Sequence, residues 1–320
     1  REPAYRLRQI KKAIFQNLIE NWSQATDLPL SLRERLDEEF PLSINGKFTL
    51  SKDQRTAKAL ITLKDGLQIE AVLMRYPDGK NTVCVSSQVG CPLGCKFCAT
   101  GQMGFKRNLE IFEIVEQVLF FARYLKNLGK KITNIVFMGM GEPFLNYENV
   151  LGAIRILNDK EGFNLGARKI SISTVGIVEG IEKLTKEKLQ INLAISLHAP
   201  NEKLRTELMP INKKYALKVI FQAVDNYIKK TNRKIMFEYL MIKNVNDSDE
   251  CAKKLAKLLK KQLYFVNLIS YNPTGIFQPS PQGRIKKFKE ILKKEGILVT
   301  ERYRFGRGIK AACGQLATEK

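Results

Sequence analysis

Hydrophobic and polar positions repeat in the same order six times between residues 83 and 295. Each repeat pairs a short β-rich run with a longer segment whose apolar residues recur at helical spacing. The β-rich runs are VCVSSQ, TNIVFMGMG, KISISTVG, INLAISLHAP, KIMFEYLMI and YFVNLISYNP. The helical segments cover residues 109–128, 147–158, 178–188, 215–230, 248–261 and 282–295. Alternating β/α units predict a parallel sheet with helices outside it. Six units, rather than eight, predict an α/β fold built as a partial (β/α)6 barrel of the TIM type.

The first eighty residues follow a different pattern. Charged, helical-looking segments at residues 5–20 and 31–40 precede alternating stretches around ALITL and QIEAVLM. This pattern predicts a small α+β module. We therefore divide the chain into an N-terminal accessory module (1–80), a barrel core (81–312) and a C-terminal tail (313–320).

Unusual sequences stand where four predicted strands end, namely GMGEP, STVG, SLHAP and YNPTG. Each alone is typical of an ordinary turn, because Gly, Pro, Asn and Ser are common loop residues. In βα barrels the loops at the carboxyl ends of the strands converge on one mouth, which carries the active site. Four such segments on one rim therefore favour a site there.

Charge and composition add a second constraint. The chain has 320 residues, 44% of them hydrophobic, and 54 Lys plus Arg against 32 Asp plus Glu give a net charge of +22. Such a charge attracts a polyanion such as nucleic acid, or simply keeps the protein soluble. No window has 18 consecutive apolar residues, and REPAYRLRQIKKAIF lacks the apolar core of a signal peptide. We expect a cytoplasmic protein with no membrane partner, and a monomer by default.

Three of the six cysteines lie close together in the loop after the first strand of the barrel. Cys91, Cys95 and Cys98 form C-x3-C-x2-C. A disulfide framework is disfavoured in a large chain of cytosolic type. Structural zinc takes four ligands, and the fourth would have to come from a distant residue: Cys84, Cys251, Cys313 or His198, the only histidine. The alternative is a [4Fe–4S] cluster held by three thiolates, with one iron open and Phe97 shielding the sulfurs.

Seven motifs in order make the chain recognisable: CVSSQVGCPLGCKFCATGQMGFKRNL, FMGMGEP, SISTVG, AISLHAPN, MPINKKY, NLISYNP and AACGQLA. They cover nearly the whole chain, which resembles the RlmN and Cfr family of radical S-adenosylmethionine (SAM) RNA adenine methyltransferases. The resemblance implies one [4Fe–4S] cluster on Cys91, Cys95 and Cys98, and two SAM molecules per turnover. Pro143 is typical of the branch that methylates adenine C2; Ala stands there in the branch that methylates C8, which remains an alternative.

The resemblance also implies catalytic roles. Cys313 resembles the methyl carrier, which takes a methyl group from one SAM. A 5′-deoxyadenosyl radical from the second SAM then removes a hydrogen from it, and the resulting radical attacks C2 to form a protein–RNA adduct. Cys84 matches the partner that releases the product through a transient disulfide with Cys313, and Glu70 matches the proton acceptor. Without the resemblance, the cysteines would be ordinary buried side chains and Glu70 a solvated carboxylate. Cys251, outside any motif, keeps a structural interpretation.

The resemblance also implies residues that contact SAM, the RNA substrates and a reductant partner. The SAM contacts are Gly141, Glu142, Ser173, Ser196, Leu197, His198 and Asn272. The implied substrates are 23S ribosomal RNA and the anticodon loop of tRNA, and a reductant protein such as flavodoxin or ferredoxin supplies electrons. Basic candidates for phosphate contact are Arg6, Arg8, Lys11, Lys12, Lys106, Arg107, Arg302, Arg304 and Arg307. A rival from another class is a non-enzymatic, zinc-stabilised RNA-binding protein, which leaves Cys313 and the rim motifs unexplained.

Overall fold

A computed structural model describes residues 3–260, 263–303 and 305–318 of the chain. Its main sheet has the strand order β1-β2-β3-β4-β7-β8-β9-β10-β11-β12. The strands from β4 onward are parallel to their neighbours, whereas β1, β2, β3 and β4 pair antiparallel. Their bounds are β1 Gly46–Leu50, β2 Thr56–Thr62, β3 Gln68–Arg75, β4 Asn81–Val85, β7 Asn134–Phe137, β8 Ile170–Thr174, β9 Asn192–Ser196, β10 Ile235–Met241, β11 Tyr264–Ser270 and β12 Leu298–Glu301.

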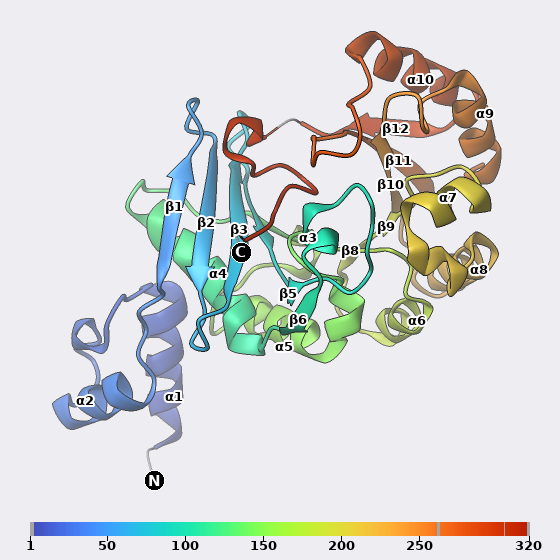
Figure 1. The fold of residues 1–320 in the computed structure, drawn as a ribbon. Coiled ribbons are helices and arrows are strands. Elements are labelled where there is room, and N and C mark those ends of the chain that lie inside the picture. Colours follow the sequence, from blue (N-terminus) through green and yellow to red (C-terminus); the bar gives the residue numbers. More distant parts are fainter. Residues whose placement is uncertain (1–2, 261–262, 304, 319–320) are drawn as a thin grey trace.

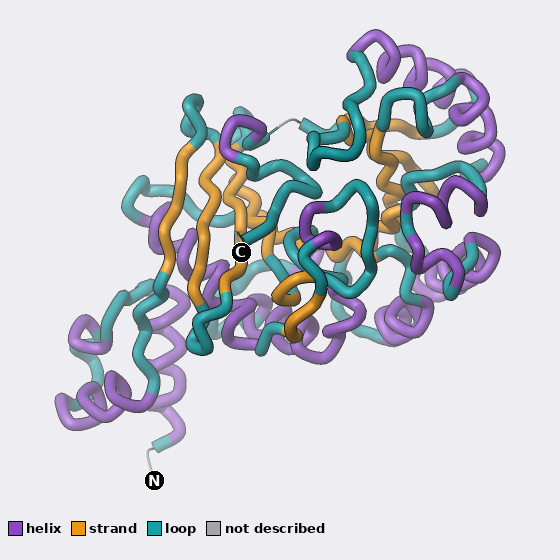
Figure 2. The backbone as a smooth tube through the Cα atoms, in the orientation of Figure 1, coloured by secondary structure: helices purple, strands orange, loops and turns teal. Residues whose placement is uncertain are grey.

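Helices follow the parallel strands and lie around the outside of the sheet, as Figures 1 and 2 show. They are α4 Ile111–Lys126, α5 Tyr147–Asn158, α6 Val178–Lys186, α7 Glu202–Leu208, α8 Leu217–Thr231, α9 Asp249–Leu258 and α10 Gln282–Lys294. In α4 the inward face repeats at Ile114, Val118, Phe121 and Leu125, all fully buried, which is the spacing of one helical face. The six predicted β/α units and the partial barrel are thus confirmed, with β12 as an additional parallel strand.

The N-terminal residues contribute to two cores. Helices α1 (Ala4–Lys11) and α2 (Leu30–Glu39) belong to a small separate cluster around Trp22, whose indole N–H donates to the carbonyl of Phe40 over 2.8 Å. By contrast, β1, β2 and β3 extend the barrel sheet itself. One continuous sheet therefore crosses residue 80, and the division of the chain there remains a prediction.

The C-terminal segment runs back across the open mouth of the barrel, between β3 and the short helix α3 (Ala99–Gln102), as Figure 1 shows. Thr100 Oγ1 donates to the carbonyl of Leu316 over 2.6 Å, and the N–H of Ala99 donates to the carbonyl of Gly314 over 2.8 Å. These bonds hold the tail, and with it Cys313, against the loop of Cys91, Cys95 and Cys98. Within the described residues, no helix combines the length and the apolar character needed to cross a bilayer.

Candidate active site

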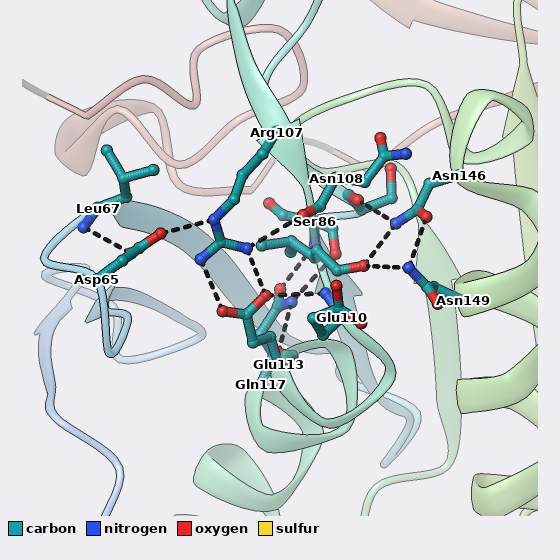
Figure 3. A network of polar contacts seen from close by, with 12 residues as sticks. Asp65, Leu67, Ser86, Arg107, Asn108, Glu110, Glu113, Gln117, Asn146 and Asn149 are labelled. Carbon is teal, nitrogen blue, oxygen red and sulfur yellow. Dashed lines mark hydrogen bonds and ion pairs between the residues drawn. The ribbon is translucent and has the colours of Figure 1, made fainter.

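The cysteine loop is carried on a small hairpin, β5 (Gln88–Gly90) and β6 (Phe105–Asn108). Arg107 anchors this hairpin, since its guanidinium donates two 2.8 Å bonds to Glu113 of α4 and one of 2.6 Å to Asp65 (Figure 3). Bidentate pairing of this kind fixes both distance and orientation. Arg107 therefore serves inside the fold, and the prediction that it contacts RNA phosphate finds no support in this geometry.

Close backbone contacts shape the loop. Gly90 has φ +75°, and a Cβ on it would lie 1.9 Å from the carbonyl oxygen of Gly104, so glycine is required there. Three backbone N–H groups are used within and around the loop: Cys91 donates to Gly104, Lys96 to Leu208 and Cys98 to Cys95. The loop is thereby held in one conformation with its cysteines on one cavity wall.

The three thiols fit a cluster ligand set. Burial raises the pKa of Cys91 to about 12 and raises the pKa of Cys95 strongly. Such thiols become thiolates when a cation binds them, because the cation compensates the buried charge. Among the described residues, no group of three or more His, Cys, Asp or Glu side chains is placed to hold a single metal ion. A [4Fe–4S] cluster requires something else, since each thiolate binds a separate iron.

A cavity beside the cysteine loop, here called the loop cavity, collects most of the predicted SAM contacts. Cys91, Cys95 and Cys98 line it together with residues from the carboxyl ends of β7, β8 and β9, namely Gly141, Glu142, Ser173, Ser196 and His198. Leu197 is fully buried beside them, and Asn272 lies in a neighbouring cavity. The structure therefore brings strand ends that are far apart in sequence to one site, as the parallel topology predicts.

Gly141 and Glu142 are held tightly. Gly141 has φ +94°, and a Cβ there would lie 2.5 Å from Cβ of Gln88. The carboxylate of Glu142 accepts from the N–H of Phe144 over 3.0 Å and from that of Val175 over 2.9 Å. Burial raises the pKa of Glu142 to about 7. Glu142 thus ties two rim loops together as well as facing the cavity.

His198 is a neutral hydrogen-bonding group. Its Nδ1 accepts the N–H of Leu240 over 3.1 Å, and burial lowers the pKa of the imidazole to about 3. A neutral ring with an accepting Nδ1 carries its proton on Nε2. The Phe97 ring packs edge-on against it at 4.9 Å between centroids. His198 can therefore donate a hydrogen bond into the loop cavity but cannot act as a cation there.

A second cavity adjoins the first and is here called the aromatic cavity. Cys84 and Asn272 line it with Arg302 and three aromatic residues, Tyr76, Tyr303 and Phe305. Cys313 lines both cavities. Burial raises the pKa of Cys313, and it raises that of Cys84 to about 12. All six cysteines are free thiols. The structure thus brings Cys84 and Cys313, which are 229 positions apart in the sequence, to one cavity.

Glu70 contacts the C-terminal tail but is not among the residues that line the two cavities. Its side chain on β3 is buried, with Oε1 2.6 Å from Lys58 Nζ and Oε2 accepting the N–H of Ala317 over 2.9 Å. Leu316, the residue before Ala317, lines both cavities. Glu70 therefore lies next to the segment that carries Cys313.

Three charged residues of the site were missed or misassigned from the sequence. Arg302 lies inside the aromatic cavity, and its guanidinium contacts Cys313 and Glu238; this geometry gives no support to the prediction that it contacts RNA phosphate. Glu238 is a charged residue within the otherwise apolar strand IMFEYLM, and this position in the sequence could have indicated a site residue. Arg205 is fully buried and donates to the carbonyls of Val175, Ser196 and Leu197, which links the loops after β8 and β9.

The other basic candidates are spread over the surface. Arg8, Lys12 and Lys106 are exposed, and Lys11 pairs with Asp159 over 2.7 Å. Arg6 donates to Gln9 and to the carbonyl of Asp27. Arg307 begins the turn Arg307–Ile309, and Arg304 lies outside the described residues. Contact between these residues and RNA remains a prediction.

Known proteins match this chain over nearly its whole length. A family model of the radical SAM superfamily matches residues 85–258. A probable dual-specificity RNA methyltransferase RlmN of Dictyoglomus thermophilum is 47% identical over 98% of this chain and 91% of its own. The ribosomal RNA large subunit methyltransferase N of Nitrosopumilus maritimus is 44% identical over 98% and 93%. The crystal structure of a radical SAM methyltransferase from Sphaerobacter thermophilus is similar with a TM-score of 0.96 and 46% identity, over 98% of this chain and 93% of that one.

Proposed function

Because the chain belongs to the RlmN family of radical SAM RNA methyltransferases, we propose that it methylates C2 of an adenosine in 23S ribosomal RNA and in the tRNA anticodon loop. The family uses one [4Fe–4S] cluster and SAM. Adenine C2 is an electron-poor carbon that does not attack a methylsulfonium, so a radical route is needed. When bound in the loop cavity, the cluster and SAM supply a carbon-centred radical.

The observation that carries the proposal is the position of Cys313 on the wall shared by the two cavities. On one side are the three clustered thiols, and on the other are Cys84 and the aromatic side chains. A methyl carrier must reach a donor and an acceptor in turn, and this position offers both. The aromatic cavity is the place for the target base, because flipped bases are read by stacking on aromatic side chains.

Each residue then has a role in sequence. Cys313 accepts the methyl group on Sγ. The radical that the bound cofactors would supply takes one hydrogen atom from that methyl group, and the resulting S–CH2 carbon forms the bond to C2; one electron would return to the cluster when the C2 proton leaves. Glu70 accepts the proton that leaves C2, from its position beside the tail. Cys84 Sγ then attacks Cys313 Sγ, the bond between that sulfur and the CH2 carbon breaks, and this carbon takes a proton. The methylated RNA is thereby released, and a disulfide remains that an external reductant reopens. Two SAM molecules are used per turnover, one for the methyl group and one for the radical.

The remaining assignments follow the family resemblance. Pro143 of GMGEP supports C2 over C8. The net charge of +22 supports RNA binding that weakens as salt rises, and residues 1–80 form an accessory RNA-binding module. We expect a monomer that takes its electron from a small reductant protein such as flavodoxin or ferredoxin.

Anaerobic reconstitution followed by nucleoside mass spectrometry tests this function. Protein loaded with iron and sulfide is incubated with SAM, a reductant and unmodified 23S ribosomal RNA or tRNA. We expect bound iron with a visible absorption band, and 2-methyladenosine from both RNAs. A product of 8-methyladenosine would overturn the C2 assignment, and one tightly bound zinc without iron or methylation would overturn the enzyme itself.

A further inference from the structure

A buried ion pair touches the sulfur of Cys313. One terminal nitrogen of Arg302 lies 3.1 Å from Cys313 Sγ, and the other lies 2.6 Å from Glu238 Oε1 and 3.0 Å from Met138 Sδ. Arg302 follows β12, and Glu238 lies within β10, so the two ends of the pair come from different strands. The side chains are only 22% and 5% exposed.

We propose that Arg302 is a catalytic residue that stabilises Cys313 as a thiolate for methyl transfer, and that Glu238 is the positioning residue that aims Arg302 at the sulfur. The proposal rests on the proposed function, in which Cys313 accepts a methyl group. It adds the two residues that prepare the sulfur for that step.

The charge balance around Cys313 requires such a cation. A thiolate removed from water is costly unless a positive charge lies beside it. Cys84 and Tyr76 share the aromatic cavity with Cys313, and burial raises the pKa of both, so neither compensates a negative sulfur. Burial raises the pKa of Cys313 itself, and the charges of Glu238 and Cys98 raise it further, whereas Arg302 lowers it. Arg302 is the cation in contact with this sulfur.

Glu238 keeps the guanidinium in place before and after the transfer. Its Oε2 accepts from Ser173 Oγ over 2.7 Å, and Ser173 Oγ lies 3.2 Å from Ser196 Oγ. Both oxygens of the carboxylate are therefore fixed, one by Arg302 and one by the serines of the loop cavity. Because the carboxylate is held at both oxygens, it also fixes the orientation of the guanidinium, whose other terminal nitrogen points toward Cys313.

The methyl transfer balances with these groups. The thiol proton leaves to solvent when the thiolate forms. The thiolate electron pair then forms the new S–C bond, the old C–S bond of the SAM sulfonium breaks, and its electron pair stays on that sulfur. Thiolate and sulfonium charges cancel, giving two neutral thioethers. Arg302 then keeps Glu238 as its counterion, so no unpaired cation is left buried.

Thiol reactivity measures the effect without requiring methylation. Reconstituted holoenzyme whose Cys313 peptide carries no methyl group is treated anaerobically with iodoacetamide across a pH series, in the absence of SAM. Peptide mass spectrometry gives the pH at which Cys313 alkylation is half-maximal. The variants are Arg302→Gln, Arg302→Lys and Glu238→Gln. Arg155→Gln is the matched control, because Arg155 pairs with Glu187 on an outer helix.

We expect Arg302→Gln to raise the midpoint by at least about one pH unit, a tenfold loss of thiolate at a fixed lower pH. Arg302→Lys should raise the midpoint less than Arg302→Gln does, because lysine keeps a positive charge. Glu238→Gln removes a negative charge that by itself raises the pKa of Cys313, so a midpoint that rises nevertheless shows that Glu238 acts by aiming Arg302. A midpoint that falls would remove Glu238 from the proposal. Iron content equal to wild type establishes that each variant is folded, and Arg302→Met, a second uncharged replacement, carries the test if the Gln variant does not fold. An unchanged midpoint in folded Arg302 variants would overturn the proposal.

The same samples separate this inference from the proposed function. If wild-type Cys313 gains no methyl group on incubation with SAM, the proposed function fails, whatever the midpoints are. If wild type is methylated and the Arg302 variants keep both the wild-type midpoint and the wild-type methylation rate, only the inference about Arg302 fails.

Discussion

The backbone N–H of Ala317 donates a hydrogen bond to the carboxylate of Glu70 over 2.9 Å. The residue that matches the family's proton acceptor therefore also holds the tail that carries Cys313. Substitutions at Glu70 must separate these two roles. Glutamine keeps an oxygen that can accept from Ala317, but its NH2 group then faces Lys58 Nζ, so thermal denaturation must accompany the activity assay.

Glu70→Gln is expected to methylate Cys313 normally but to lower RNA turnover by about 100-fold or more, the usual effect of losing a general base. The unreleased Cys313–RNA adduct should accumulate. The measurements are peptide mass spectrometry for the methyl group, nucleoside mass spectrometry for the product and denaturing gels for the adduct. Glu148→Gln, at an exposed carboxylate paired with Lys183, serves as the control. Normal turnover in Glu70→Gln would remove Glu70 from the reaction.

Cys84→Ala is expected to trap RNA on the protein, because the thiol that resolves the adduct is missing. A denaturing gel of the anaerobic reaction should show a covalent protein–RNA band whose amount approaches one per enzyme, with little free methylated RNA. Cys251→Ala is the matched control, since Cys251 lies on α9 away from both cavities. Multiple turnovers by Cys84→Ala would show that Cys313 is resolved by another group.

Gly141→Ala is expected to weaken SAM binding by about tenfold and to lower stability. The residue has φ +94° and its added Cβ would lie 2.5 Å from Gln88; a left-handed non-glycine residue costs about 1–3 kcal/mol. Isothermal titration of SAM and thermal denaturation measure the two effects. Gly166→Ala is the control, because no atom lies within 4 Å of its added Cβ. Equal SAM affinity in both variants would show that the GMGEP backbone does not need this conformation.

His198 makes the stability of the protein depend on pH. Burial lowers the pKa of its imidazole from 6.5 to about 3. As the pH falls, the unfolded chain takes up a proton on His198 before the folded chain does. The stabilisation of the folded state by the neutral imidazole is therefore present above pH 6.5 and is lost as the pH falls toward 3. Between pH 6.5 and pH 5, wild type should lose roughly 1.6 kcal/mol of unfolding free energy relative to His198→Gln, because the slope approaches about 1.4 kcal/mol per pH unit only below pH 6.5. Urea denaturation of both cluster-free proteins at the two pH values measures this; parallel curves would mean that His198 is solvated.

The fold was predictable wherever one face of an element is consistently apolar. The helix at α5 was predicted within its observed bounds, Tyr147–Asn158, because its buried residues recur at helical spacing. Helix α7, Glu202–Leu208, was not predicted, because it is short and one of its buried residues is Arg205. Sequence patterns treat arginine as exposed, whereas the guanidinium of this one donates its hydrogen bonds to backbone carbonyls from two other loops.

The site was predictable only as far as motifs mark strand ends. The topology placed Gly141, Ser173 and His198 on one rim, and the structure brings them together. The contact between Arg302 and Glu238 spans 64 positions of the sequence, so no local pattern contains it. A basic residue near the C-terminus suggested RNA binding, and only the path of the tail shows that its partner is a cysteine.

Methylation of RNA by Cys313→Ala, compared with wild type and Cys251→Ala under identical anaerobic conditions, tests the role of Cys313 most directly. Wild type and Cys251→Ala should give 2-methyladenosine. Their Cys313 peptide should be heavier by one methyl group or should carry the covalent RNA adduct. Cys313→Ala should bind its iron–sulfur cluster and SAM yet give no methylated adenosine. Normal 2-methyladenosine formation by Cys313→Ala would contradict the methyl-carrier mechanism.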